Sequence, residues 1–329
     1  MRNAHAAAAL CAAAACALIA SAQGSAPLRV LRTGRTEKFQ VELRVRSEVE
    51  GQKPTTIGAK TYVQPVSEWV EQKIAWNVER RVSSTDAAGG AEIEERLANF
   101  SDAASSSGKD PDTTKMLEAL KAAIQPWEAP RMLHYRETRA GQITGLEAAA
   151  APPVEEQAPR VLTAWLLRAL RPTAALPAHP LAYNQSWQEP RKVQFVEWSG
   201  TTGSESGEWL GATAALRAQN EPAVQLHTTQ EIAGTVTAGN EKPTEGTAQA
   251  HFHSESLSTL ALEDLRLLGA TRSAAREIVW TLAAVEGLAK PPQFRGRLLA
   301  EIRIIGCDEN PCTDHGVGNP GAGASGGNR

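Results

Sequence analysis

Apolar side chains recur at every second residue along several segments of this chain, and this spacing limits the folds that it can adopt. The pattern is clearest in two segments far apart in the sequence, 39–45 and 298–304. Successive side chains of a strand point to opposite faces, so the spacing predicts strands with one buried and one wet face. Such strands indicate antiparallel pairing, because strands of parallel sheets are buried on both faces and show no polar alternation.

Less regular versions of the pattern predict further strands at 74–78, 93–100, 132–137, 193–198, 208–216, 224–236, 248–257 and 278–282. We expect a turn at 139–142, with Ile143 and Leu146 on the returning strand. The stretch 262–282 contains good helix formers, but the sequence at 269–272 is typical of a turn, which favours a hairpin over a helix.

Two segments have the spacing of an amphipathic helix. One begins near Asp110-Pro111-Asp112 and ends at Pro126, and the other spans 159–171 and ends at Pro172. Proline at an early position, acids in the first turn and proline after the last turn are helix boundary signals. The expected fold is therefore mainly β (α+β): an antiparallel, strongly curved, half-barrel-like sheet with two amphipathic helices, the second covering the concave face.

The first 22 residues predict a signal peptide. Arg2 precedes an apolar, alanine-rich run that ends in Ala20-Ser21-Ala22, the small-x-small pattern before a cleavage site. The run is about 14 residues long, whereas a transmembrane helix needs about 20. We therefore expect cleavage between Ala22 and Gln23 and export to the periplasm or the outside of a bacterial cell envelope, with no transmembrane segment.

The rest of the chain is expected to form one β-rich domain at 23–315, with two lobes meeting near 147–160 if it is divided at all. The segment 316–329 is rich in glycine and predicts a disordered tail. Cys307 and Cys312 frame a proline-containing loop, which in an oxidising compartment predicts a disulfide. The alternatives are a metal clip with Asp308, Asp314 and His315, or two free thiols.

Net charge and the absence of known motifs argue against some function classes. The formal net charge of −3 argues against nucleic acid as a partner. The sequence contains no phosphate loop, no Rossmann glycine fingerprint and no His-Glu-x-x-His motif, so we expect no enzyme and no cofactor. The segment 203–207 resembles a nucleophile elbow only superficially, because Glu205 stands where serine is required. The surrounding residues 199–207 predict a polar hairpin loop.

Histidines and tryptophans are the remaining candidates for chemistry. His251 and His253 point to one face of a predicted strand, and His227 lies on a neighbouring one. They could bind a metal or, with a carboxylate, serve a hydrolase, but a solvated strand face also holds histidines, and we predict no metal site. Tryptophans could line a ligand cavity or pack in the core, and Trp187 and Trp209 flank polar loops.

One stretch resembles a family of exported, uncharacterised bacterial β-rich proteins. The resemblance lies in the strand at 141–146, the following helix, Leu176-Pro177 and Ser186-Trp187, with Asn184-Gln185 in place of Gly-Asp. The family is similar in strand pattern to periplasmic half-barrels that enclose bound acyl chains. The expected function is non-catalytic binding of a lipid or other apolar or amphipathic ligand in the cell envelope, with Trp165 and Leu166 as candidate contacts. The alternative is a structural or interaction module of the envelope.

Overall fold

The computed structural model describes residues 29–57, 60–108, 113–114, 117–118, 121–122, 125, 129–141, 143–145, 170, 186–191, 198–209, 217–218, 221–236, 247–281, 288 and 290–307. Its strands are β1 (Thr36–Ile57), β2 (Lys60–Thr85), β3 (Ala91–Ser106), β4 (Arg131–Glu137), β5 (Ile143–Thr144), β6 (Ser186–Arg191), β7 (Trp198–Trp209), β8 (Arg217–Ala218), β9 (Glu221–Val236), β10 (Thr247–Ala261), β11 (Leu267–Thr281) and β12 (Gln293–Cys307).

These strands form one antiparallel sheet in the order β5-β4-β3-β2-β1-β12-β11-β10-β9-β7-β6, with β8 paired to β9. The mainly β, antiparallel prediction is confirmed. Neighbours in the sheet are mostly neighbours in sequence, except that β1 pairs with β12 and β7 pairs with β9. The two alternating segments, 39–45 and 298–304, therefore lie side by side, with Val41 opposite Ile304.

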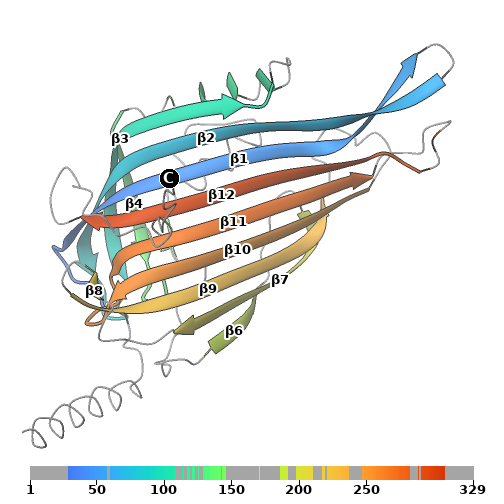
Figure 1. Ribbon diagram of the computed structural model, residues 1–329. Helices are drawn as coiled ribbons and strands as arrows, with labels where there is room; N and C mark the ends of the chain where they lie inside the picture. The colour runs from blue at the N-terminus through green and yellow to red at the C-terminus, as the bar shows by residue number, and fades with distance from the viewer. Residues whose placement is uncertain are drawn as a thin grey trace, which may run out of the picture.

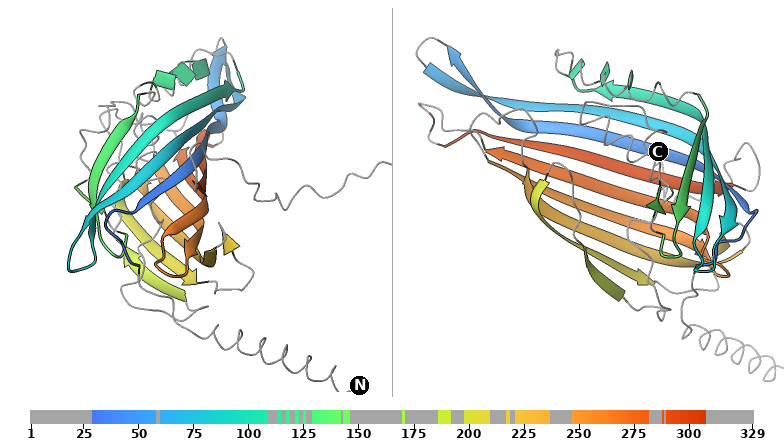
Figure 2. Two further views of the ribbon diagram at one scale, coloured as in Figure 1. Left: turned by 90° about the vertical axis from the view of Figure 1, so that its left-hand side faces the viewer. Right: turned by 180° about the vertical axis from the view of Figure 1, so that it is seen from behind.

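The sheet is strongly curved (Figures 1 and 2). Its buried apolar side chains alternate with exposed ones along the strands and so share one face, on the concave side. Phe39, Leu43, Trp76 and Leu97 are buried in one cluster, and Leu133 of β4 and Leu226 of β9 belong to the same cluster. This cluster therefore extends over one face of the sheet from β4 to β9. We call this concave side the inner face and the opposite side the outer face.

Buried charges close one end of the curved sheet, where β2 ends and β3 begins. Glu137 of β4 is paired with both Arg29 and Arg80, and all three side chains are almost inaccessible to solvent. Arg80 also lies 3.3 Å from Glu37, and Arg35 pairs with Asp264 in the turn between β10 and β11. The segment 29–35 thus ties β4 to the β10–β11 turn through arginines. The neighbouring carboxylates raise the pKa of Arg80 well above its ordinary value, although burial alone would lower it.

Not every local prediction agrees with the structure. The residues at 199–207, predicted as a polar hairpin loop, belong to β7, which pairs with β6 and β9. The predicted turn at 269–272 lies within β11. The stretch forms a strand rather than a helix, but the predicted hairpin within it is wrong, because the turn lies at 262–266 between β10 and β11, where buried Leu265 has a φ of 55°. The turn at 139–142 is confirmed, since the Gly141 amide donates to the Thr138 carbonyl.

The two amphipathic helices remain predictions. In the first, Thr113, Thr114, Leu117, Glu118, Lys121 and Ala122 have helical backbone, but the residues between them lie outside the described ranges. In the second, only Leu170 is described, as a buried turn residue. The leader at 1–22, the segment 147–160, the predicted strand residues 193–197 and 210–216, and the tail at 316–329 also lie outside the described residues.

We predict that Glu137→Gln destabilises the fold by about 3–5 kcal/mol, because it leaves two buried guanidinium groups with a neutral partner. Urea denaturation monitored by circular dichroism measures this change. The matched control is Glu301→Gln, which alters an exposed carboxylate 3.5 Å from Arg44 and should change stability by less than about 1 kcal/mol. Equal effects of the two substitutions would contradict the importance of the buried cluster.

Candidate functional site

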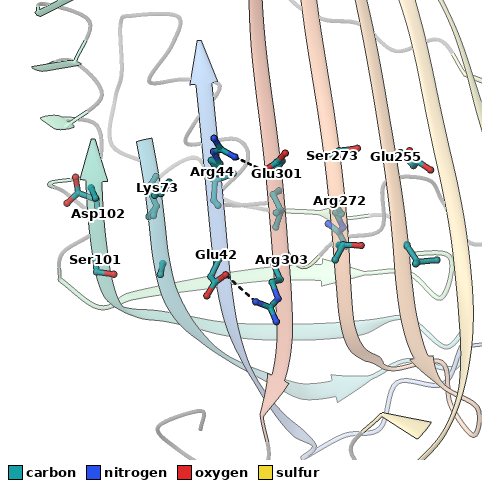
Figure 3. A pocket seen from close by; sticks show the side chains of 17 residues that line it. Glu42, Arg44, Lys73, Ser101, Asp102, Glu255, Arg272, Ser273, Glu301 and Arg303 are labelled. Carbon is teal, nitrogen blue, oxygen red and sulfur yellow. Dashed lines mark hydrogen bonds and ion pairs between the residues drawn. The ribbon is translucent and has the colours of Figure 1, made fainter. Parts of the chain in front are cut away.

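The outer face carries a groove with a volume of about 850 Å³, which crosses six adjacent strands from β3 to β10 (Figure 3). Two parallel rows of outward-facing side chains border it. One row contains Glu42 and Arg303, and the other contains Arg44 and Glu301, directly opposite each other on β1 and β12. The residues between the rows, such as Leu43 and Ile74, are buried in the core on the inner face. The groove is therefore polar on its sides.

Charges along the groove are paired across the strands. Arg44 donates to Glu71 from Nε at 2.9 Å and Nη2 at 2.7 Å, and it lies 3.5 Å from Glu301. Arg303 lies 3.9 Å from Glu42, and both pairs across β1 and β12 are drawn in Figure 3. The hydrogen bond from Arg44 lowers the pKa of Glu71, and burial opposes this shift. The groove can form hydrogen bonds and ion pairs with a polar partner.

The lowered pKa of Glu71 predicts a pH-dependent contribution to stability. A carboxyl with a lower pKa in the folded state stabilises the fold above its unfolded pKa, and this contribution is lost as the pH falls through the folded value. Glu71→Gln should therefore be less stable than the wild type at pH 7. The difference should shrink below about pH 4. Chemical denaturation at a series of pH values measures it, and a constant difference down to pH 2 would refute the assignment.

The three candidate histidines lie on the outer face of β9 and β10, and each contacts a carboxylate. His227 Nε2 lies 2.7 Å from Glu255, while His251 and His253 both contact Glu231. The latter two rings approach different oxygens of one carboxylate, so the carboxylate bridges them. Within the part of the chain that the structure describes, no group of three or more His, Cys, Asp or Glu residues could hold a metal ion.

A second apolar cluster lies on the inner face, toward the end opposite the buried charges. Ile232, Ala250 and Ile278 are buried there, with Phe252 and Trp280 packed against them and half-buried. Two glycines make room for these rings. A Cβ at Gly296 would lie 2.7 Å from the ring of Trp280, and one at Gly51 would lie 2.5 Å from the ring of Phe294. We call Phe252, Ile278, Trp280 and Phe294 the open-end patch.

An arginine adjoins this patch on the same face. Arg276 lies opposite Phe252 of β10 and Leu298 of β12 in the strand register. Its Nε atom is buried, although the side chain as a whole is only half-buried. The inner face of β11 therefore places a positive charge next to exposed aromatic area.

Several residues singled out in the sequence cannot be placed in a site. Cys307 is the last residue of β12, but Cys312 lies outside the described residues, and so do Ala22, Gln23, Trp165 and Leu166. The disulfide and the signal cleavage therefore stay predictions. Trp187 and Trp209 lie on β6 and β7, whose pairing is described but whose tryptophan side chains are not.

The open-end patch was missed because single residues such as Phe252 and Phe294 give no motif. Two sequence features could have indicated it: the alternation at 278–282 and the glycine at position 296. Glycine within a strand often marks a site where another group approaches the backbone closely. Neither feature reveals which strands become neighbours.

Comparisons with known proteins identify no family for this chain. No family model matches it, and no curated protein matches it. Among solved structures, lipovitellin aligns over 84% of this chain and 25% of its own, with 10% identity and a TM-score of 0.40. An outer membrane channel from Pseudomonas putida F1 aligns over 84% of this chain and 98% of its own, with 10% identity and a TM-score of 0.23. This chain spans about a quarter of the length of lipovitellin, and similarities this low identify neither fold nor function.

No helix within the described ranges has the length and hydropathy needed to span a bilayer.

Proposed function

We propose that this protein is an exported, non-catalytic binder of an apolar or amphipathic ligand, which lies along the inner face at the open-end patch. The observation that carries the proposal is the pair of half-buried aromatic residues, Phe252 and Trp280, beside the buried Ile278. Aromatic side chains that keep accessible area on a concave apolar surface offer contact area to a ligand. The predicted leader supports export.

The driving force would be burial of hydrocarbon against this surface, at about 25 cal/mol per Å². A ligand that covers about 200 Å² of apolar area would gain about 5 kcal/mol before the cost of association. Arg276 adds a positive charge beside the aromatic rings, and this charge suits an amphipathic ligand with an anionic end group. The glycines at 51 and 296 support a shaped surface, since any side chain there would displace Phe294 or Trp280.

We predict that Trp280→Ser weakens binding of a long-chain amphiphile about tenfold or more. Loss of about 60 Å² of apolar contact corresponds to about 1.5 kcal/mol. Fluorescence titration with Nile red, followed by competition with oleic acid, measures the affinity of the purified chain.

The control is Leu299→Ser, which removes a half-buried apolar side chain from β12 on the outer face. It should leave the affinity unchanged. Native mass spectrometry then identifies any lipid that co-purifies. If the wild type takes up neither dye nor lipid, or if the two variants bind equally weakly, ligand binding at the open-end patch is wrong.

The second candidate function is a structural or interaction module of the envelope, and the outer groove favours it. Its sides carry acids and bases in similar number and its lining also includes apolar groups, which suits a protein segment with both charged and apolar side chains. If this function is correct, cross-linking in the envelope should trap the wild type in a complex with a protein partner. Lys73→Glu combined with Arg303→Glu should abolish that complex. The same variant should keep the wild-type affinity for Nile red, and loss of both properties would indicate misfolding instead.

A further inference from the structure

The hairpin formed by β1 and β2 extends beyond the rest of the sheet. In the register of these two strands, the last six pairs run from Gln52 opposite Pro65 to Ile57 opposite Lys60. The pairing of β12 with β1 stops at Gly51, and the pairing of β3 with β2 stops at Val70. The end of the hairpin is therefore a two-stranded ribbon about 20 Å long, and it projects from the open end in Figures 1 and 2. We call residues 52–57 and 60–65 the arm.

Large apolar side chains are exposed on this arm. Ile57 is 69% exposed, Tyr62 is 50% exposed and Val63 is 36% exposed. Ile57 and Tyr62 are diagonal neighbours on one face of the ribbon, because Tyr62 lies opposite Thr55. Of the five large hydrophobic residues exposed among the described residues, these three lie in one hairpin, whereas Val30 and Met132 stand apart. Such clustering is typical of an interaction site.

The charge of the arm differs from that of the chain. Residues 52–67 contain two lysines, Lys53 and Lys60, and no acidic residue, while the whole chain has a net charge of −3. Basic residues beside apolar ones are typical of segments that bind the surface of anionic membranes. Tyrosine is also enriched at the interface between lipid and water, where its ring meets the acyl region and its hydroxyl meets water.

The edge of the arm is unsuited to pairing with a strand of another protein. Pro54 lies on the edge of β1 that no longer pairs with β12, and proline cannot donate a main-chain hydrogen bond. Proline on an edge strand is a common protection against strand addition. This feature favours a partner that contacts side chains at the tip over one that extends the sheet.

We propose that the arm docks on the surface of a bilayer that contains anionic lipid, with Ile57 and Tyr62 in the interface and Lys53 near the headgroups. This inference is independent of the proposed ligand site. It rests on exposure, charge and the projection of the hairpin beyond its neighbouring strands.

Co-sedimentation with lipid vesicles tests the proposal on the purified chain. We expect the wild type to bind vesicles of phosphatidylcholine with about 30% phosphatidylglycerol and to bind pure phosphatidylcholine at least about tenfold more weakly. Ile57→Asp combined with Tyr62→Asp should reduce binding to the anionic vesicles by about tenfold or more. Because both residues are exposed, this variant should keep the wild-type unfolding midpoint, which shows that the loss is not caused by misfolding.

Met132→Asp is the matched control, since Met132 on β4 is 49% exposed but lies outside the arm. It should bind the anionic vesicles like the wild type. A second matched pair is Lys53→Glu, which should weaken binding, against Lys38→Glu at the opposite end of β1, which should not. The proposal is wrong if the wild type stays in solution with anionic vesicles, or if the arm variants sediment as the wild type does. It is also wrong if the control variants lose binding to the same extent.

Discussion

The main-chain pairing of β1 with β12 holds the two halves of this sheet together. It runs from Lys38 opposite Cys307 to Gly51 opposite Phe294, and it joins strands from the two ends of the described chain. The strands β2 to β5 connect to the rest of the sheet through β1, and β6 to β11 connect through β12. The shared core of β4 and β9 residues therefore depends on a contact between residues that are distant in sequence. Such non-local pairing carries a large entropic cost in folding.

Part of this architecture could be predicted from the sequence. The alternation at 39–45 and 298–304 defined both strands and their buried faces, because the period of two follows from the geometry of a single strand. The order of the strands could not be predicted, since an amphipathic strand gives no information on which partner covers its backbone groups. The segment 199–207 illustrates a second limit. Its glycines and serines are typical of a loop, yet pairing with β6 and β9 on both sides makes it a strand.

The candidate site was harder to predict than the fold for the same reason. Trp280 and Phe294 are opposite each other on β11 and β12, and the space for their rings comes from glycines on β12 and β1. The sequence around these positions contains no motif, and the glycines and rings can be matched only when β1, β12 and β11 are aligned. The histidines show the reverse case. Their spacing correctly predicted a common face, but the partner that each ring contacts, Glu231 or Glu255, depends on the pairing of β9 with β10.

The two ends of the curved sheet differ in a way that bears on both proposals. At one end, Arg29, Arg80 and Glu137 are buried from solvent. Separating a buried ion pair costs several kcal/mol, because it leaves a charge without a partner. This end of the sheet should therefore stay closed. At the other end, Phe294 lies opposite Gly51, the last residue before the arm begins. Half-buried aromatic area and the projecting hairpin therefore lie at the same end of the molecule. If the arm rests on a bilayer, the open-end patch lies at the end of the molecule nearest the lipid, and an amphiphile would reach the inner face without crossing the buried charges. The two proposals stand on separate residues, so a chain that binds Nile red but not vesicles would keep the ligand site and remove the membrane route.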